Sequence, residues 1–236
     1  MIKAEAPSMI LGAGRQALHV LDLMKWIGMP CDSVVLFDDV ARQQQFGPYG
    51  LPIRGMIEDG VQECIRSGAP SIVAIGSRFG AFRYRIFRQL AAAGVPLVRL
   101  VHSSCVIAPD ADIGPNLVMM PGCVIAPKAK IGPLCCMFSN CSIEHDCSVG
   151  TNTIFGAGVI CCGAVKIGDH CFLGSGAICC PEVQIGDRSL IGAGSVVASD
   201  VPSDVVLAGH RAHLQRRPEK GGDVPLASEL GEVGAL

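Results

Sequence analysis

The sequence predicts an α/β region followed by an all-β parallel β-helix, and three observations carry this prediction. Short apolar segments alternate with helical patterns before about residue 100. From Cys105 to Asp200 the chain divides into sixteen consecutive hexads without an insertion. The 236 residues are 50% hydrophobic and 17% charged, which is typical of a folded protein with a large buried core.

The first hundred residues carry the signals of a small parallel sheet. Four apolar runs are interpreted as short buried strands, at 8–11, 34–37, 71–76 and 96–100. Apolar residues at helical spacing predict helices over 16–27 and 79–94, and Gly94 is placed to cap the second. Strands that alternate with helices predict a sheet of Rossmann-like type.

A glycine-rich turn, LGAG at 11–14, closes the first predicted strand and opens the first helix. Its N–H groups can receive a phosphate, but an ordinary tight turn needs glycine just as much. Asp38 and Asp39 end the second strand, where acidic side chains can bond a ribose or base, or cap a helix. A nucleotide site and a structural turn therefore both fit these residues.

The hexads predict the second part of the chain. The third position of every hexad is aliphatic, Phe, Met or Cys, and a glycine follows this position in eight of the sixteen hexads. We expect each hexad to form one strand and turn, with the third side chain in the core. We expect the glycine to permit the tight backbone turn at the corner. The period resembles the left-handed β-helix of bacterial acyltransferases, which implies three hexads in each coil.

Thirteen cysteines show no zinc or disulfide spacing, because several are adjacent pairs. Six occupy the first hexad position and are interpreted as small buried core residues: Cys105, Cys123, Cys135, Cys141, Cys147 and Cys171. A covalent acyl-cysteine route is for this reason the lesser alternative to direct transfer.

His145 lies between Glu144 and Asp146 in the stretch SIEHDCSVG, at the fifth position of its hexad and so at a corner. A carboxylate beside an imidazole orients the ring and raises its basicity, as a general base requires. With three hexads in a coil, Gly163 stacks on His145 and leaves room for a thioester carbonyl. A polar corner of the repeat is the competing interpretation.

Seven motifs follow one another in the order typical of one enzyme family: LGAG, FDD, AIGS at 74–77, VHSSCVIAP at 101–109, SIEHD at 142–146, CCGAVKIG at 161–168 and FLGSGA at 172–177. Over residues 8–215 the chain resembles the nucleotide-linked aminosugar N-acetyltransferases, such as the bacillosamine-pathway and perosamine enzymes. Sialic-acid O-acetyltransferases are close relatives. The resemblance implies a nucleotide-sugar-binding domain over 1–100 and a left-handed β-helix acyltransferase domain over 101–217. Residues 218–236 have no periodicity and are expected to form a flexible tail.

The same resemblance implies roles for particular residues. His145 is expected to be the general base, Asp146 its partner, and the Gly163 amide the donor to the oxyanion. The nucleotide sugar is expected at Gly12, Ala13, Gly14, Arg15, Asp38, Asp39, Gly76 and Ser77. Acetyl-CoA is expected along the groove between β-helices of a homotrimer, with contacts from Gly163, Phe172, Gly174, Gly192 and Arg211.

Two departures from the family leave the acceptor open. Phe138 stands where the bacillosamine enzyme has an asparagine, and Ile154 replaces a second site histidine. Transfer to the 4-amino group of a nucleotide-linked deoxysugar is the preferred prediction. A sialic-acid-type sugar O-acetyltransferase and a catalytically impaired nucleotide-sugar-binding scaffold are the alternatives. UDP, GDP and dTDP are equally compatible with the sequence.

Composition argues against other classes. The net charge is −2 with no Lys/Arg cluster before the C-terminal end, so neither nucleic acid nor a membrane is an expected partner. No apolar run of about 18 residues and no signal-peptide layout is present, which predicts a cytoplasmic enzyme. No two histidines are five apart, so the zinc site of γ-class carbonic anhydrases, and a metal in general, are not expected.

Overall fold

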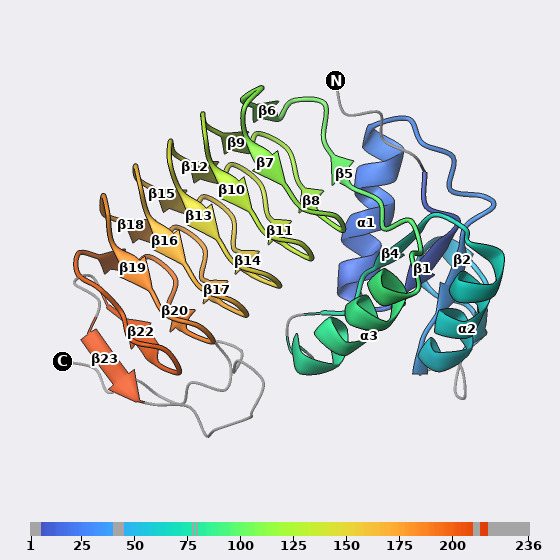
Figure 1. Cartoon of the computed structure of the whole chain (residues 1–236). Coiled ribbons are helices and arrows are strands. Elements are labelled where there is room, and N and C mark those ends of the chain that lie inside the picture. The colour runs from blue at the N-terminus through green and yellow to red at the C-terminus, as the bar shows by residue number, and fades with distance from the viewer. Residues whose placement is uncertain (1–5, 40–44, 77, 79, 210–212, 217–236) are drawn as a thin grey trace.

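The computed structural model describes residues 6–39, 45–76, 78, 80–209 and 213–216. Its first part is a four-stranded parallel sheet in the order β3-β2-β1-β4, with helices packed around it (Figure 1). The strands are β1 (Met9–Leu11), β2 (Val35–Phe37), β3 (Ile53–Gly55) and β4 (Ser71–Val73); the helices are α1 (Arg15–Trp26), α2 (Ile57–Ser67) and α3 (Gly80–Ala92), with a short 3₁₀ turn over Pro48–Gly50. No helix in these described ranges is long and apolar enough to cross a membrane.

The predicted strand over 96–100 is wrong as a member of this sheet. Leu97 makes one isolated bridge to Ser71, and Leu100 already pairs with the β-helix. The fourth place in the sheet belongs to β3, which together with α2 was not predicted. The apolar run at 96–100 instead serves as the entry into the β-helix, because its last residue is completely buried there.

The described residues from 100 to 209 wind into a β-helix of three long parallel sheets, and one more strand, over 213–216, adds to the eight-stranded sheet in antiparallel orientation (Figure 1). Each of the sixteen hexads forms one two-residue strand, as predicted, and three more strands lie outside the hexads. The strands are β5 (Leu100–Val101), β6 (Val106–Ile107), β7 (Asp112–Ile113), β8 (Val118–Met119), β9 (Val124–Ile125), β10 (Lys130–Ile131), β11 (Cys136–Met137), β12 (Ser142–Ile143), β13 (Ser148–Val149), β14 (Ile154–Phe155), β15 (Ile160–Cys161), β16 (Lys166–Ile167), β17 (Phe172–Leu173), β18 (Ile178–Cys179), β19 (Gln184–Ile185), β20 (Leu190–Ile191), β21 (Val196–Val197), β22 (Val206–Ala208) and β23 (His213–Arg216).

Strand register confirms the coil length. Cys136 pairs with Ile154 and Ser142 with Ile160, so each strand lies beside the strand three hexads further on. From β5 to β21, every third strand along the chain belongs to the same sheet, which gives the triangular coil. The predicted left-handed β-helix after an α/β region is confirmed.

The interior of the coil is formed by the first and third hexad positions. Every third-position side chain is buried except Ile107, which lies in the first coil. Of the six first-position cysteines, five are buried and Cys105 is half-buried. Burial raises the pKa of the Cys135 and Cys171 thiols to about 12, so these thiols stay protonated at neutral pH. Their interpretation as core residues is confirmed.

The corners are built differently from the prediction. Left-handed backbone occurs at the sixth hexad position, as at Asn140 and Asp146, and not at the glycine of the fourth. That glycine is needed because the next coil passes so close. A Cβ at Gly132 would lie 2.7 Å from the carbonyl carbon of Gly150. The fourth-position glycine therefore provides room for the neighbouring coil and no unusual φ.

Polar side chains tie the two parts of the chain together. Asn116 accepts a 2.8 Å hydrogen bond from the Val73 N–H and donates to the Val73 carbonyl, so it pairs with the outer edge of β4. The buried Arg83 of α3 donates to the Asn152 side chain at 2.7 Å and to the Leu134 carbonyl at 2.9 Å. Helix α1 packs on the outer face of the eight-stranded sheet, so the α/β part is fixed against the β-helix.

Candidate active site

The candidate base lies at a corner between the six-stranded and the five-stranded sheets, directly after β12. The residues at this corner in successive coils form the His145 column: Pro109, Pro127, His145, Gly163, Pro181 and Ser199. Proline fits such a corner because its φ is fixed and it needs no N–H partner. His145 and Gly163 interrupt this structural preference in two consecutive coils.

Asp146 holds the imidazole of His145. The Nδ1 of His145 lies 2.9 Å from Oδ2 of Asp146, and this hydrogen bond lowers the pKa of the Asp146 carboxyl below its usual range. An ionised carboxylate accepts a hydrogen bond from the N–H at Nδ1, so Nε2 carries the free lone pair. The pair has the orientation that a general base requires.

Gly163 makes room for that lone pair. A Cβ at Gly163 would lie 2.6 Å from Nε2 and 2.7 Å from Cε1 of His145, closer than any real side chain can approach. The predicted stacking of Gly163 on His145 is therefore present. The backbone agrees, because the Ala164 N–H donates to the His145 carbonyl at 2.8 Å.

The Gly163 N–H is unused by the fold. The neighbouring residues Cys162 and Ala164 both donate to adjacent coils, but no backbone hydrogen bond in the described residues uses the Gly163 N–H. The prolines of the same column explain why, since a position that tolerates proline has no structural use for a donor. A free N–H beside a base is the arrangement that stabilises an oxyanion.

The base is open to solvent in a single chain. The side chains of His145 and Asp146 are 64% and 52% exposed. Two clefts of the described β-helix lie elsewhere: one at its first coil, around Arg99 and His102, and one beside β19, around Gln184. The site therefore lacks a wall that would exclude water.

The glycine-rich turn is held by Asp38. The Ala13 N–H donates to Oδ2 of Asp38 at 2.6 Å, which brings the two predicted parts of the nucleotide site together. Gly12 has φ of 119°, and its Cβ would lie 2.4 Å from the Ala74 carbonyl, so glycine is obligatory there. Gly14 and Arg15 are exposed at the start of α1.

Asp39 and Gly76 differ in their surroundings. Asp39 accepts from the Ile57 N–H at 3.2 Å and so lies at the start of α2, as the capping interpretation allows. Gly76 follows β4 and is half-buried. Ser77 and Arg211 lie outside the described residues.

Phe138 and Ile154 lie against helix α1. Phe138 contacts the His19 ring edge-on at 5.1 Å between centroids, and Ile154 is buried in the same cluster. Phe172, expected near CoA, packs on this cluster too, while Gly174 and Gly192 are buried at the next corner of the coil. The two departures from the family thus replace polar groups by apolar contacts with α1.

One polar cluster was not predicted from the sequence. Asn152 donates to the Gly80 carbonyl at 3.1 Å and lies 2.9 Å from Nδ1 of His170, besides accepting from Arg83. The His170 ring also contacts Tyr84 edge-on. Only the spacing of three hexads between Asn152 and His170 hints at their contact; the approach of α3 has no sequence signal. Among the described residues, no group of three or more His, Cys, Asp or Glu is arranged to hold a metal.

Comparison with known proteins gives a consistent result. The family described as hexapeptide repeat of succinyl-transferase matches residues 164–199. No curated protein sequence matches the chain. The perosamine N-acetyltransferase PerB of Caulobacter crescentus, solved with CoA and GDP-perosamine, is similar at 28% identity and a TM-score of 0.78, over 88% of this chain and 96% of that one.

Two more distant structures share the fold. The acetyltransferase domain of PglB from Neisseria gonorrhoeae, solved with acetyl coenzyme A, matches at 24% identity and a TM-score of 0.77, over 88% of this chain and 98% of that one. WeeI from Acinetobacter baumannii matches at 22% identity and a TM-score of 0.75 over the same shares. The predicted resemblance to nucleotide-linked aminosugar N-acetyltransferases, and with it an acyltransferase, is confirmed.

Proposed function

We propose that this chain, an acyltransferase similar to the nucleotide-linked aminosugar N-acetyltransferases, transfers the acetyl group of acetyl-CoA to the 4-amino group of a nucleotide-linked deoxysugar. The observation that carries the proposal is the meeting of three groups at one corner. A carboxylate-held imidazole, a glycine beside its free nitrogen and an unused N–H are all present at His145, Asp146 and Gly163.

Each group has one role in the reaction. The amine attacks the thioester carbonyl while His145 Nε2 takes its proton, and Asp146 stabilises the imidazolium through Nδ1. The Gly163 N–H donates to the oxyanion of the tetrahedral intermediate. When the intermediate collapses, the C–S bond breaks and CoA leaves as the thiol after receiving the proton from His145.

The sugar nucleotide is assigned to the turn over Gly12–Gly14 and to Asp38. Backbone N–H groups at the start of α1 favour a phosphate, and the exposed guanidinium of Arg15 adds a positive charge there. The GDP-perosamine in the PerB structure supports this substrate class. The nucleotide itself stays open among UDP, GDP and dTDP.

We assign the complete site to the boundary between two copies of the chain in a homotrimer. The α1 surface meets the β-helix at Phe138, before β12, while His145 follows β12. A turn at Ser139–Asn140 and the coil side that contains β12 lie between these positions, and a side of about five extended residues spans roughly 16 Å, too far for one sugar. Exposed apolar side chains lie on the outer face of the six-stranded sheet in other coils, with Val106 61% and Ile160 39% exposed, which suits contact with a second copy.

The test is release of CoA thiol from acetyl-CoA with UDP-, GDP- and dTDP-linked 4-amino-4,6-dideoxysugars. Turnover with one acceptor, reduced about a hundredfold or more in His145→Ala, is the expected result. Ser199→Ala, in the same column, is the control and should retain the parental rate. Turnover with a sugar hydroxyl and with no amine would identify the chain as an O-acetyltransferase. Binding of the nucleotide sugar without any turnover would identify it as a catalytically impaired scaffold.

Sharing of the site between copies has its own test. Gly14→Glu places a negative charge at the turn, and no atom lies within 4 Å of its Cβ, so the fold accepts the change. Neither Gly14→Glu nor His145→Ala alone should be active. Co-refolded mixtures of the two should regain turnover if one copy supplies the turn and another the base; mixtures as inactive as the parents would place both in one chain.

A further inference from the structure

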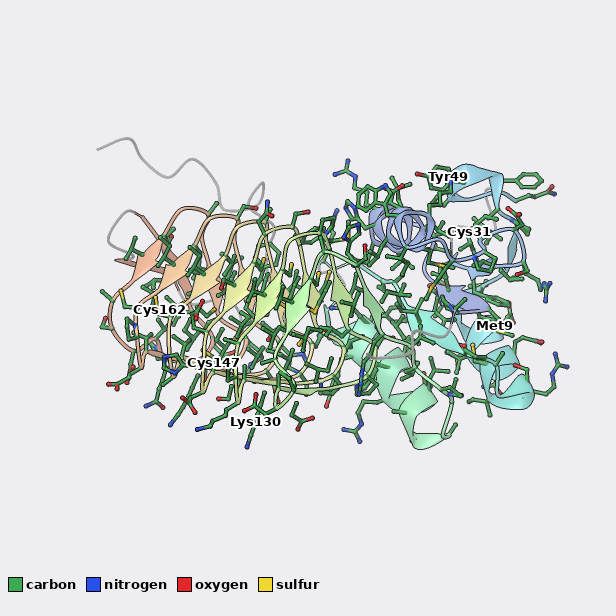
Figure 2. All side chains as sticks on the ribbon, turned by 90° about the horizontal axis from the view of Figure 1, so that it is seen from above. Met9, Cys31, Tyr49, Lys130, Cys147 and Cys162 are labelled. Atoms are coloured by element: carbon green, nitrogen blue, oxygen red, sulfur yellow. The ribbon has the colours of Figure 1, made fainter. Side chains whose placement is uncertain are left out.

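The thiol of Cys147 lies directly behind the peptide group that carries the Gly163 N–H. Cys147 is buried at the first position of its hexad, and its Sγ donates to the carbonyl of Cys162 at 3.1 Å. The carbonyl of Cys162 and the N–H of Gly163 belong to the same peptide group. Figure 2 shows Cys147 and Cys162 together on the β-helix, away from Cys31 and Met9 of the α/β part.

The geometry of this peptide determines where the N–H points. In a trans peptide the C=O and N–H bonds point in opposite directions. Cys147 is 1% exposed, so the Cys162 carbonyl points into the coil and the Gly163 N–H points out of it, where the His145 side chain lies. A hydrogen bond to the carbonyl also polarises the peptide and strengthens its N–H as a donor.

This corner lacks a backbone hydrogen bond that closes the same corner in three of the six coils. In three other coils the first-position N–H closes the turn onto the fourth-position carbonyl: Ala111 to Ala108 at 3.1 Å, Ala129 to Ala126 at 3.3 Å and Val183 to Cys180 at 3.4 Å. Between Val165 and Cys162 this bond does not occur among the described backbone hydrogen bonds. Instead, the Cys162 carbonyl accepts the hydrogen bond of the Cys147 thiol.

The column of Cys147 also singles it out. The residues at this position in successive coils are Ala111, Ala129, Cys147, Val165, Val183 and Val201, and cysteine alone among them has a side-chain donor. It occurs in the coil that faces Gly163. Burial raises the pKa of this thiol to about 11, so it keeps its proton at neutral pH.

We propose that Cys147 is a positioning residue for acetyl transfer, whose S–H fixes the Cys162–Gly163 peptide so that the Gly163 N–H meets the oxyanion. Cys147 touches neither substrate nor acetyl group; it acts through the peptide. The inference rests on the proposed function, because that function assigns the Gly163 N–H to the oxyanion.

The experiment compares Cys147→Val with Cys147→Ser in the thiol-release assay. Val is the residue that this column uses in the next three coils, so the coil should remain packed. We expect kcat to fall about tenfold in Cys147→Val, with both KM values within about twofold, because only transition-state binding is weakened. Cys147→Ser restores a donor and should recover kcat to within about threefold of the parent.

Cys141→Val is the matched control. Cys141 is completely buried and donates to the Gly156 carbonyl at 3.0 Å across the same sequence separation, but at another corner. Val159 follows it in its column, so valine fits there too. Its kcat should stay at the parental value. An equal loss in Cys141→Val, or no loss in Cys147→Val, would overturn the proposal.

A readout independent of turnover separates this inference from the proposed function. In protein labelled with ¹⁵N-glycine, the amide signal of Gly163, assigned by its loss in Gly163→Ala, should shift in Cys147→Val and return in Cys147→Ser. An unmoved signal would refute the positioning by Cys147. Absence of thiol release in the parent with every acceptor would refute the function and leave the amide result to stand by itself.

Discussion

The substitution Gly163→Ala tests whether the free nitrogen of His145 must lie over a glycine. The new Cβ would lie 2.6 Å from Nε2, whereas ordinary contact begins at 3.4 Å, so the ring must move by about 0.8 Å or rotate away. A displacement near 1 Å at a reacting group costs about a hundredfold in rate. Because the His145 side chain is 64% exposed, the ring can swing into solvent without disturbing the coil.

We therefore expect kcat to fall about a hundredfold while the free energy of unfolding changes by less than about 0.5 kcal/mol. Thiol release measures the first quantity and urea denaturation the second. A double-mutant cycle sharpens the test, since Gly163→Ala should cost little more once His145 is already alanine. Full additivity of the two losses, or an unchanged kcat in Gly163→Ala, would refute the steric argument.

Three further substitutions test the surroundings of the site and the join between its parts. Asp146→Asn should lower kcat about tenfold or more with KM values unchanged, because the carboxylate holds the ring and touches no substrate; a parental kcat in steady-state kinetics would contradict this. His170 has its pKa lowered by burial from 6.5, so its contribution to stability is complete above that pH and is lost as the pH falls below it. The Tm should drop between pH 7.5 and 5.5, and less so in His170→Gln; parallel curves would refute the assignment. Arg83→Ala should cost about 3 kcal/mol or more in urea denaturation, because two buried hydrogen bonds from a charged group are lost. Arg188→Ala, which breaks a half-exposed pair with Asp204, should cost less than about 1 kcal/mol, and equal losses would show that burial is not decisive.

The features that depend on the hexad period were predicted correctly from the sequence. The repeat, together with the three-hexad coil that the family resemblance implies, determines which residues stack, so the contact of Gly163 with His145 followed from counting three hexads along the chain. Asp146 needed no tertiary information either, since it is the next residue. The stacked cysteines were interpreted correctly for the same reason.

Contacts between the α/β part and the β-helix could not be predicted from the hexad period. Arg83 lies 69 residues before Asn152, and only the docking of α3 brings them together. The strand β3 has a single buried residue, Ile53, and thus almost no hydrophobic pattern. Helix α2, in contrast, carries sequence signals, with apolar residues at Ile57, Val61 and Cys64 that are buried and a left-handed Gly68 at its end.

The coils of the β-helix stack at a regular spacing along its axis. Helix α1 holds the glycine-rich turn against the coils of β8 to β17, and His145 lies at one fixed height in that stack. Each coil adds about 4.8 Å along the axis. Inserting or deleting one whole coil before His145 would move the base by that step and leave every corner intact. In the proposed reaction, the distance between the nucleotide and the reacting amine is therefore set in whole coils, so a chain of this kind would change the length of its acceptor only in steps of one coil.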